Sequence, residues 1–338
     1  MRRCNGIRRG VAHMPKLVIQ IPCFNEAETL PIVLADLPRA VPGIDSIEIV
    51  VIDDGSSDDT ASVARACGAH HVESFPRHLG LARAFMAGLE AALQRGADII
   101  VNTDADHQYR GEDIPRLIAP ILAGHAELVV GTRPIESMNF SPVKRYLQRL
   151  GSRVTRFVSN TSVEDAPSGF RAFSREAALR LHVFNKHTYT LETIIQAGQN
   201  GMAVASVPIG TNPELRPSRL VKGLGSYVAL QVLVMLRVFV VYRPFRFFAF
   251  WGVLLFTMGF LIGLRFLYDF VTGEGAGGHV QSLILAAMLM GMGLSLGVVG
   301  LLADLLAVNR SLLEGVDWRL KKLEERVTKL GNGRAGGS

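Results

Sequence analysis

The most informative part of the chain reads Ala97-Asp98-Ile99-Ile100-Val101-Asn102-Thr103-Asp104-Ala105-Asp106. Three consecutive β-branched residues at its centre predict a strand that is buried on both faces. Asp104 and Asp106 then stand at the carboxyl end of that strand, the edge at which doubly wound α/β sheets bind ligands. Two carboxylates separated by one residue can hold one Mg²⁺ or Mn²⁺ and leave positions for a diphosphate. A solvated acidic turn is the alternative interpretation.

The surrounding sequence alternates short β-branched runs with helical patterns, which predicts a mostly parallel sheet with right-handed crossovers. The strands are expected at residues 17–21, 47–52, 99–101, 128–130 and 204–209, and a further strand begins at His70 and His71. The helices are expected at residues 26–37, from 56, at 81–95, from about 112, at 143–159 and at 189–198, with a turn at 165–171.

Two apolar runs near the end of the chain predict a membrane hairpin. Residues 247–264 and 283–303 contain no charged side chain, and each can cross a bilayer core of ~30 Å as a helix. A pair of buried core helices is the alternative. Basic residues flank the hairpin outside the glycine-rich loop 273–278, namely Arg237, Arg243, Arg246, Arg310, Arg319, Lys321 and Lys322. This asymmetry predicts a multi-pass plasma-membrane protein in which the large domain before the hairpin and both termini are cytoplasmic.

The same patterns divide the chain into five parts: a flexible basic tail at 1–14, an α/β domain at 15–222, an interfacial amphipathic helix within 223–246, the hairpin at 247–308 and a cytoplasmic helix with a flexible tail at 309–338. In the last part, apolar residues recur at spacings of three and four: Leu313, Val316, Leu320, Leu323, Val327 and Leu330. This heptad stripe predicts either a helix on the lipid headgroups or a coiled coil. The hairpin and this helix are candidate contacts in a homo-oligomer.

Composition narrows the class of protein. A net charge of +6 in 338 residues fits a protein that lies against an anionic membrane, and no nucleic-acid-binding motif accompanies it. Cys4, Cys23 and Cys67 are few and unpatterned, which argues against a disulfide framework or a zinc site and suits a reducing cytosol.

Four polar segments are expected at the carboxyl edge of the sheet. They are residues 22–26, 53–56, 104–108 and 168–171. Glu26 and Asp53 can accept hydrogen bonds from a ribose or a base, and Gly55 permits a close backbone approach.

These segments read I-P-C-F-N-E, D-D-G-S-S-D-D-T, D-A-D-H-Q and S-G-F-R. Over residues 16–222 the chain resembles inverting family-2 glycosyltransferases of the GT-A fold, in the branch that makes polyprenyl- or dolichyl-phosphate sugars. The resemblance implies a nucleotide-sugar site at Pro22, Asn25, Glu26, Asp53, Asp54 and Gly55. It implies a metal site at Asp104, Asp106 and Gln108. It also implies phosphate contacts from Arg133 and from the loop that contains Arg216, Ser218 and Arg219.

The expected reaction is inverting transfer of a sugar from a nucleotide diphosphate sugar to polyprenyl phosphate at the cytoplasmic face, with a UDP-sugar favoured over GDP-mannose. Asp104, Asp106, Arg133 and Asp165 are the expected catalytic residues. Some relatives carry an acid where this chain has Gly169, so a general base at Asp165 or Glu192 stays open. A lipid phosphate is already anionic and needs positioning more than deprotonation. The alternatives are a synthase that glycosylates a lipid hydroxyl and a non-catalytic sensor of nucleotide sugars.

Overall fold

The computed structural model describes residues 14–134, 153, 156, 159–183, 189–213, 240, 244–272 and 280–335. The chain divides into two compact units, Met1–Leu224 and Gly225–Ser338. Arg216, Ser218 and Arg219 and the loop at 273–278 lie outside the described residues. Of the expected helix at 143–159, only Arg153, Arg156 and Ser159 are described. Of the expected interfacial helix within 223–246, only Val240 and residues 244–246 are described.

The first unit is built on one seven-stranded sheet. Its strands are β1 (Lys16–Cys23), β2 (Ser46–Asp53), β3 (His71–Ser74), β4 (Ile99–Asn102), β5 (Leu128–Thr132), β6 (Arg171–Ser174) and β7 (Val204–Pro208). Their order across the sheet is β3-β2-β1-β4-β6-β5-β7. All neighbours pair in parallel except β6, which runs antiparallel to both β4 and β5. This confirms the mostly parallel α/β sheet expected from the sequence.

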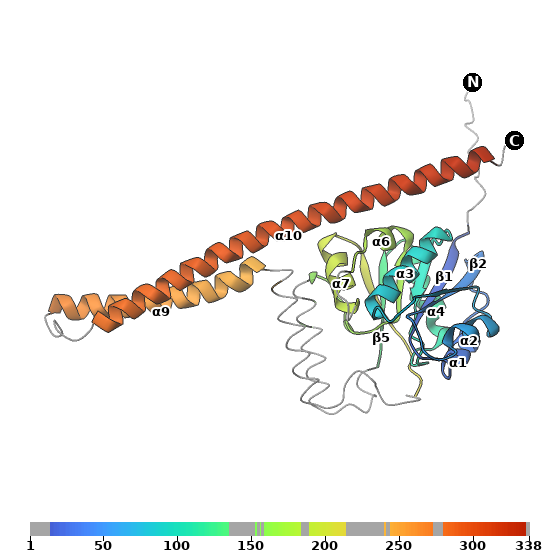
Figure 1. Cartoon of the computed structure of the whole chain (residues 1–338), viewed down its shortest axis with the longest axis horizontal. Coiled ribbons are helices and arrows are strands. Elements are labelled where there is room, and N and C mark those ends of the chain that lie inside the picture. Colours follow the sequence, from blue (N-terminus) through green and yellow to red (C-terminus); the bar gives the residue numbers. More distant parts are fainter. Residues whose placement is uncertain are drawn as a thin grey trace, which may run out of the picture. The chain divides into compact units, whose positions relative to one another are not determined.

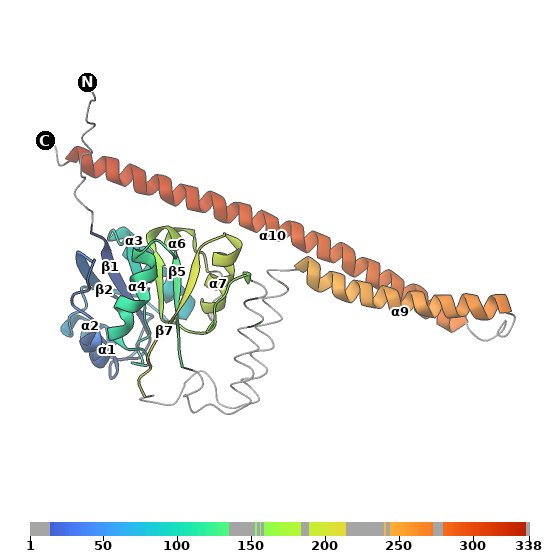
Figure 2. The same ribbon diagram turned by 180° about the vertical axis from the view of Figure 1, so that it is seen from behind.

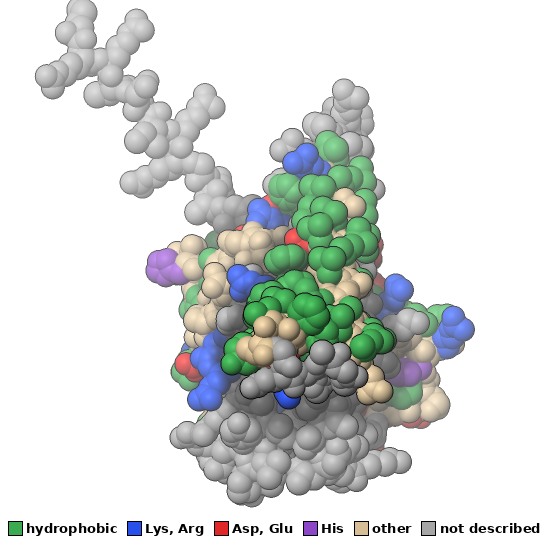
Figure 3. Space-filling view, turned by 90° about the vertical axis from the view of Figure 1, so that its left-hand side faces the viewer, with side chains coloured by type: hydrophobic (Ala, Val, Ile, Leu, Met, Phe, Trp, Pro, Cys, Tyr) green, Lys and Arg blue, Asp and Glu red, His purple; other side chains and the backbone are tan. Residues whose placement is uncertain are grey.

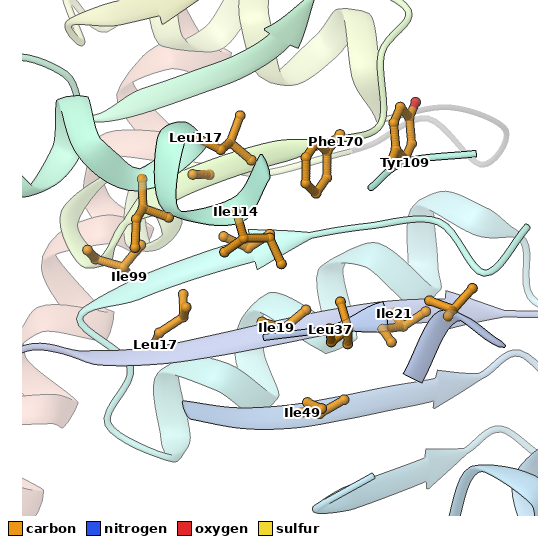
Figure 4. Packing of buried hydrophobic residues seen from close by; sticks show 14 of the residues in the cluster. Leu17, Ile19, Ile21, Leu37, Ile49, Ile99, Tyr109, Ile114, Leu117 and Phe170 are labelled. Carbon is orange, nitrogen blue, oxygen red and sulfur yellow. The ribbon is translucent and has the colours of Figure 1, made fainter. Parts of the chain in front are cut away.

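Helices cover both faces of the sheet (Figures 1 and 2). One face carries α1 (Leu30–Asp36), α2 (Thr60–Ala66) and α4 (Ile114–Leu122), the last preceded by the 3₁₀ turn η1 (Gly111–Asp113). The other face carries α3 (Leu81–Gln94), α6 (Arg175–Arg180) and α7 (Thr190–Gln199). Alternate side chains of β1 divide between the two cores: Leu17, Ile19 and Ile21 pack on the first face (Figure 4), and Val18 packs on the second. Side chains alternate between the two faces of the sheet. Because helices cover both faces, the central strands are buried on both sides.

The structure corrects three of the expected elements. Helix α1 begins at Leu30, not at Glu26, because residues 26–29 form the loop that precedes it; Pro31 then stands in the first helical turn, where its missing N–H costs nothing. Helix α2 begins at Thr60, so residues 56–59 lie in the preceding loop. The expected turn at 165–171 ends in strand β6, which is too short and too mixed in composition to show a strand pattern.

The second unit contains two long apolar helices, α9 (Pro244–Thr272) and α10 (Val280–Ala335). Their candidate membrane windows, Pro244–Thr272 and Val280–Asn309, both have a mean hydropathy of 2.2 and are only 11% and 17% buried. A core helix would be mostly buried, so the outward-facing apolar side chains (Figure 3) favour a lipid environment. Helix α10 continues to Ala335, beyond Leu330, where a flexible tail was expected.

Small residues bring α9 and α10 into contact. A Cβ atom added at Gly252 would lie 2.8 Å from the carbonyl oxygen of Gly293, and one added at Gly259 would lie 2.7 Å from that of Ala286. The spacing of seven residues on both helices is that of a left-handed pair. Close backbone approach at small residues is the usual way in which membrane helices pack.

Candidate active site

The four predicted segments meet at one edge of the sheet. Strands β1, β2, β4 and β5 end there, because they are mutually parallel in direction. Strand β6 runs the opposite way and therefore begins there, which places residues 165–170 beside the end of β4. The edge expected from Asp104 and Asp106 is thus the one at which all four segments converge.

The first two segments are tied together by hydrogen bonds. The backbone N–H of Asn25 donates to Ser56 Oγ (2.9 Å), and that of Ser57 donates to Asn25 Oδ1 (2.8 Å). Asn25 has a φ of 55°, in the left-handed region that asparagine tolerates. The backbone N–H of Ser56 donates to Asp53 Oδ1 (3.0 Å). These contacts fix the shape of the loops before a ligand arrives.

Asp54 and Gly55 hold a third loop against this pair. The Asp54 carboxylate, only 2% exposed, accepts the backbone N–H groups of Leu79 (2.7 Å) and Gly80 (2.9 Å) and lies 2.9 Å from His78 Nδ1. Gly55 has a φ of 69°, and a Cβ added there would lie 2.4 Å from the carbonyl carbon of Arg77. The predicted close approach at Gly55 therefore exists, but its partner is the protein's own loop. Both carboxylate oxygens of Asp54 are likewise used in contacts with this loop.

Asp104 and Asp106 lie together at the end of β4. Burial, and then the negative charge of Asp106, raise the pKa of Asp104 to about 7. The backbone N–H of Gln108 donates to Asp106 Oδ1 (3.0 Å). Gly169 packs directly on the carboxylate of Asp104: a Cβ added to this glycine would lie 2.6 Å from Oδ2. The absence of a side chain at position 169 is what makes room for Asp104.

Arg133, at the end of β5, is clamped by Asp165. Its Nε donates to Asp165 Oδ2 (2.7 Å) and its Nη2 to Oδ1 (3.0 Å), while its backbone N–H also reaches Oδ2 (3.2 Å). Asp165 is fully buried. The remaining Nη1 of Arg133 approaches Gln108 Oε1 at 3.5 Å. The bidentate pair aims one edge of the guanidinium at the acidic segment.

A buried polar network supports this arrangement, and sequence reasoning missed it. Asn102 Nδ2 donates to the Gly169 carbonyl (2.8 Å) and to Tyr189 Oη (2.8 Å), and the Gly169 N–H donates to Tyr109 Oη (2.9 Å). The Tyr109 ring stacks on Phe170, with centroids 5.1 Å apart (Figure 4). The only available signal was an asparagine at the end of a strand that is otherwise apolar.

Arg171 completes this support from inside the protein. Its side chain is fully buried, and its guanidinium donates to the backbone carbonyls of Ser168 (2.8 Å), Ala166 (2.7 Å) and Thr190 (2.7 Å). Burial lowers its pKa to about 10, so it stays charged at neutral pH. Within the predicted S-G-F-R segment, Gly169 therefore packs against Asp104, whereas Arg171 supports the site from the protein interior.

The donor set fits a hard divalent cation in an open site. No cluster of three or more His, Cys, Asp or Glu side chains is found in the part of the chain that the structure describes. Asp104 and Asp106 instead present two carboxylates, with the amide oxygen of Gln108 nearby. Oxygen ligands of this number leave coordination positions for water and phosphate, as Mg²⁺ and Mn²⁺ require.

The chain that leads to the expected basic loop is anchored at the same place. The backbone N–H of Asn212 donates to the carbonyl of Gln108 (2.9 Å), and its side chain donates to the carbonyl of His107 (3.1 Å). Arg216 follows Asn212 by four residues in the sequence and lies outside the described residues.

Comparisons with known proteins agree with this geometry. The family model "Glycosyl transferase family 2" matches residues 18–181. A polyprenol monophosphomannose synthase of Mycolicibacterium smegmatis is 29% identical over 61% of this chain and 81% of its own length. An undecaprenyl-phosphate mannosyltransferase of Micrococcus luteus is 30% identical over 60% and 87%. A solved glucosyl-3-phosphoglycerate synthase of Mycobacterium tuberculosis, in complex with uridine diphosphate, superposes with a TM-score of 0.52 at 25% identity, covering 67% of this chain and 79% of that one.

Proposed function

The chain belongs to glycosyl transferase family 2, and from this membership we propose that it transfers a sugar from a nucleotide diphosphate sugar to a polyprenyl phosphate. The observation that carries the proposal is the meeting of Asp104 and Asp106 with the clamped Arg133 at the sheet edge that also holds the preformed loops at Asn25 and Asp53. One side of this edge suits a nucleotide, and the other suits phosphate groups.

The nucleoside is proposed to bind over the first two segments. Pro22, Asn25, Glu26 and Asp53 line this part of the edge, and the second oxygen of Asp53 has no hydrogen bond to any described residue. That oxygen is available to a ribose hydroxyl or a base N–H. Asp54 and Gly55 contribute indirectly, because their contacts hold the neighbouring loop in place.

Asp104 and Asp106, with Gln108, are proposed to hold Mg²⁺ or Mn²⁺. A metal bound there supplies positive charge that neutralises the donor diphosphate and the leaving nucleoside diphosphate. Arg133, held by Asp165, adds a fixed positive charge next to Gln108. Preorganised charge of this kind acts on the transition state without the cost of rearranging solvent.

Asp165 is proposed to position Arg133 and not to accept a proton. Its carboxylate is fully buried and makes a bidentate pair, so protonating it would break the clamp. A polyprenyl phosphate oxygen already carries negative charge and can attack C1 of the sugar directly. The inverting course of the reaction follows from single displacement and rests on the family resemblance.

The membrane unit is proposed to hold the enzyme where its acceptor resides. Helices α9 and α10 would span the plasma membrane with both termini cytoplasmic, following the basic residues that flank them. Arg216 and Arg219 lie in the sequence between the α/β unit and the first span. They are proposed to bind the acceptor phosphate, for which the planar guanidinium is well suited.

The decisive experiment measures release of nucleoside diphosphate by the full-length chain in membranes containing undecaprenyl phosphate. UDP-sugars and GDP-mannose are supplied in parallel, since the two curated relatives are named for mannose transfer and the solved structure holds uridine diphosphate. We expect turnover with one donor class, loss of activity in chelator, and loss in Asp106→Ala. The exposed Glu112→Ala serves as the matched control.

Each alternative function predicts a different result. Turnover only with a hydroxyl-bearing lipid acceptor would indicate a glycolipid synthase. Nucleotide-sugar binding without turnover would indicate a sensor. Full activity in chelator would refute the metal site.

The acceptor loop is tested by titrating donor and acceptor separately. Arg216→Ala and Arg219→Ala are expected to raise the KM for polyprenyl phosphate, or to lower kcat if the contact forms only in the transition state. Lys222→Ala, in the same loop, is the control. An effect confined to donor affinity would assign these arginines to the diphosphate, and unchanged kinetics would remove them from the site.

A further inference from the structure

Helix α10 carries an apolar face that its own hairpin does not cover. Helix α9 starts at Pro244, and its first residues pack near Gly300 of α10, where a Cβ would lie 3.0 Å from that of Phe248. Beyond Gly300, α10 continues for another 35 residues to Ala335. Large apolar side chains on this part are exposed, among them Leu306 (68%) and Leu313 (70%).

From Leu313 onward, the leucines and valines of α10 follow a heptad pattern, whereas nearer the span Leu305 and Leu312 are apolar as well. Assigning Leu306 to position a places an unbroken series at a and d: Val299, Leu302, Leu306, Asn309, Leu313, Val316, Leu320, Leu323, Val327 and Leu330. Nine of these ten residues are apolar, and the pattern keeps a period of 3.5. That period is the signature of a coiled-coil seam, whereas a helix lying on a membrane or a domain shows a broader stripe.

The seam lies on a different side of α10 from the face that packs on α9. Gly293 and Gly300, which contact α9, occupy position b of this register. At about 100° per residue, position b lies roughly 130° round the helix from the centre of the a/d seam. The hairpin contact and the seam can therefore be satisfied at the same time.

The geometry of α10 excludes the headgroup layer as the partner of this seam. The helix is continuous from Val280 to Ala335 and contains no proline (Figures 1 and 2). A helix that crosses the bilayer and does not bend leaves it at the tilt of the span, which averages ~20°. The 26 residues after Asn309 then project about 39 Å away from the membrane, where the apolar seam faces water unless a protein covers it.

The charged residues that flank the seam favour a second copy of this chain as the partner. Copies in one membrane share an orientation, so their α10 helices run parallel. In a parallel coiled coil, position g faces position e of the next heptad on the other helix. Arg319 at g and Glu324 at e meet that rule with opposite charges. An antiparallel pairing would instead face Arg319 with Arg326 and Asp317 with Glu324, which are like charges.

We propose that residues 299–330 of α10 form a parallel coiled coil between copies of this chain, extending from the inner leaflet into the cytoplasm. Asn309 at a d position, near the end of the span, would fix the register, since a polar residue in such a seam is satisfied only by its counterpart. The proposal does not depend on the sugar-transfer reaction.

Disulfide crosslinking of the full-length chain in its membrane tests the proposal. Leu320→Cys places a thiol in the seam, and Glu325→Cys places one at position f on the opposite side of the same turn; the unmodified chain, with its native cysteines, gives the background. Mild oxidation is expected to give at least tenfold more crosslinked dimer with Leu320→Cys than with Glu325→Cys. Equal or absent crosslinking at both positions would overturn the coiled coil, including the case in which α10 packs on its own α/β unit or on lipid.

A charge exchange in the Leu320→Cys background supplies the second readout. Arg319→Glu creates two symmetric repulsive contacts, each worth ~0.2–1 kcal/mol, so crosslinking should fall about two- to thirtyfold. Adding Glu324→Arg should restore it. Loss without restoration would refute the parallel pairing, because only that pairing brings positions 319 and 324 together.

Discussion

Replacing Gly169 with alanine should disable the proposed metal site while leaving the fold intact. Gly169 does not adopt a positive φ, so its backbone accepts alanine without strain. The new Cβ would lie 2.6 Å from Asp104 Oδ2, whereas an ordinary contact begins at 3.4 Å. The carboxylate must therefore retreat by about 0.8 Å. Metal–ligand distances tolerate only ~0.2 Å, and a misplacement of ~1 Å in a catalytic constellation costs about 100-fold in rate, or ~2.7 kcal/mol.

The assay compares Gly169→Ala with the wild type and with Asp106→Ala. Manganese affinity is measured by calorimetry, and sugar transfer by release of nucleoside diphosphate. We expect Gly169→Ala to lose about two orders of magnitude in kcat/KM together with metal affinity, while its thermal unfolding changes little. Wild-type metal binding and turnover in this variant would show that Asp104 does not need its present position, and the assignment of Asp104 as a ligand would fall.

Three further predictions address other parts of the molecule. Asp165→Asn should lower the free energy of unfolding by about 3–5 kcal/mol, because it leaves a buried arginine without its carboxylate partner. The control Glu176→Gln, in a partly exposed ion pair, should cost less than ~1 kcal/mol. Similar melting temperatures for the two variants would contradict the buried Arg133–Asp165 pair. Because the pKa of Asp104 is raised to about 7, protons compete with the metal below that pH, so apparent metal affinity should rise up to about pH 7 and then level off; pH-independent calorimetric titrations would disprove this competition. Gly259→Leu should force α9 and α10 apart at a cost of about 1–3 kcal/mol and lower the melting temperature in detergent. The control Gly297→Leu should not, because no atom lies within 4 Å of a Cβ added there. Equal effects of the two substitutions would argue against the contact at Gly259.

The sequence predicted the edge of the sheet well because its signals there are local. The β-branched core of β4 and the acidic residues after it are adjacent in the chain, so period and position alone placed Asp104 and Asp106 correctly. The same holds for the loops after β1 and β2. The two long apolar helices were also evident, since charge-free runs of their length have few other interpretations.

Contacts between distant segments could not be predicted in this way. The bidentate pairing of Arg133 with Asp165 joins residues 32 positions apart. The local sequence around either residue does not indicate that the other is its partner. Strand β6 has only four residues. It becomes an antiparallel strand because it pairs with β4 and β5, and the local sequence does not show this pairing. Asn102 and Tyr109 meet Gly169 only because β6 brings that glycine back to the end of β4.

The Arg133–Asp165 clamp also has a consequence for how this protein can be altered. These two positions are separated by 31 residues in the sequence, and the ion pair holds the two ends of that segment at a fixed distance. With the ends pinned, doubling its length would cost only about 0.6 kcal/mol of closure entropy. Insertions between residues 134 and 158 are therefore expected to leave the geometry of the edge intact, whereas Ser159 and Val163 are buried against the α/β core and must be kept.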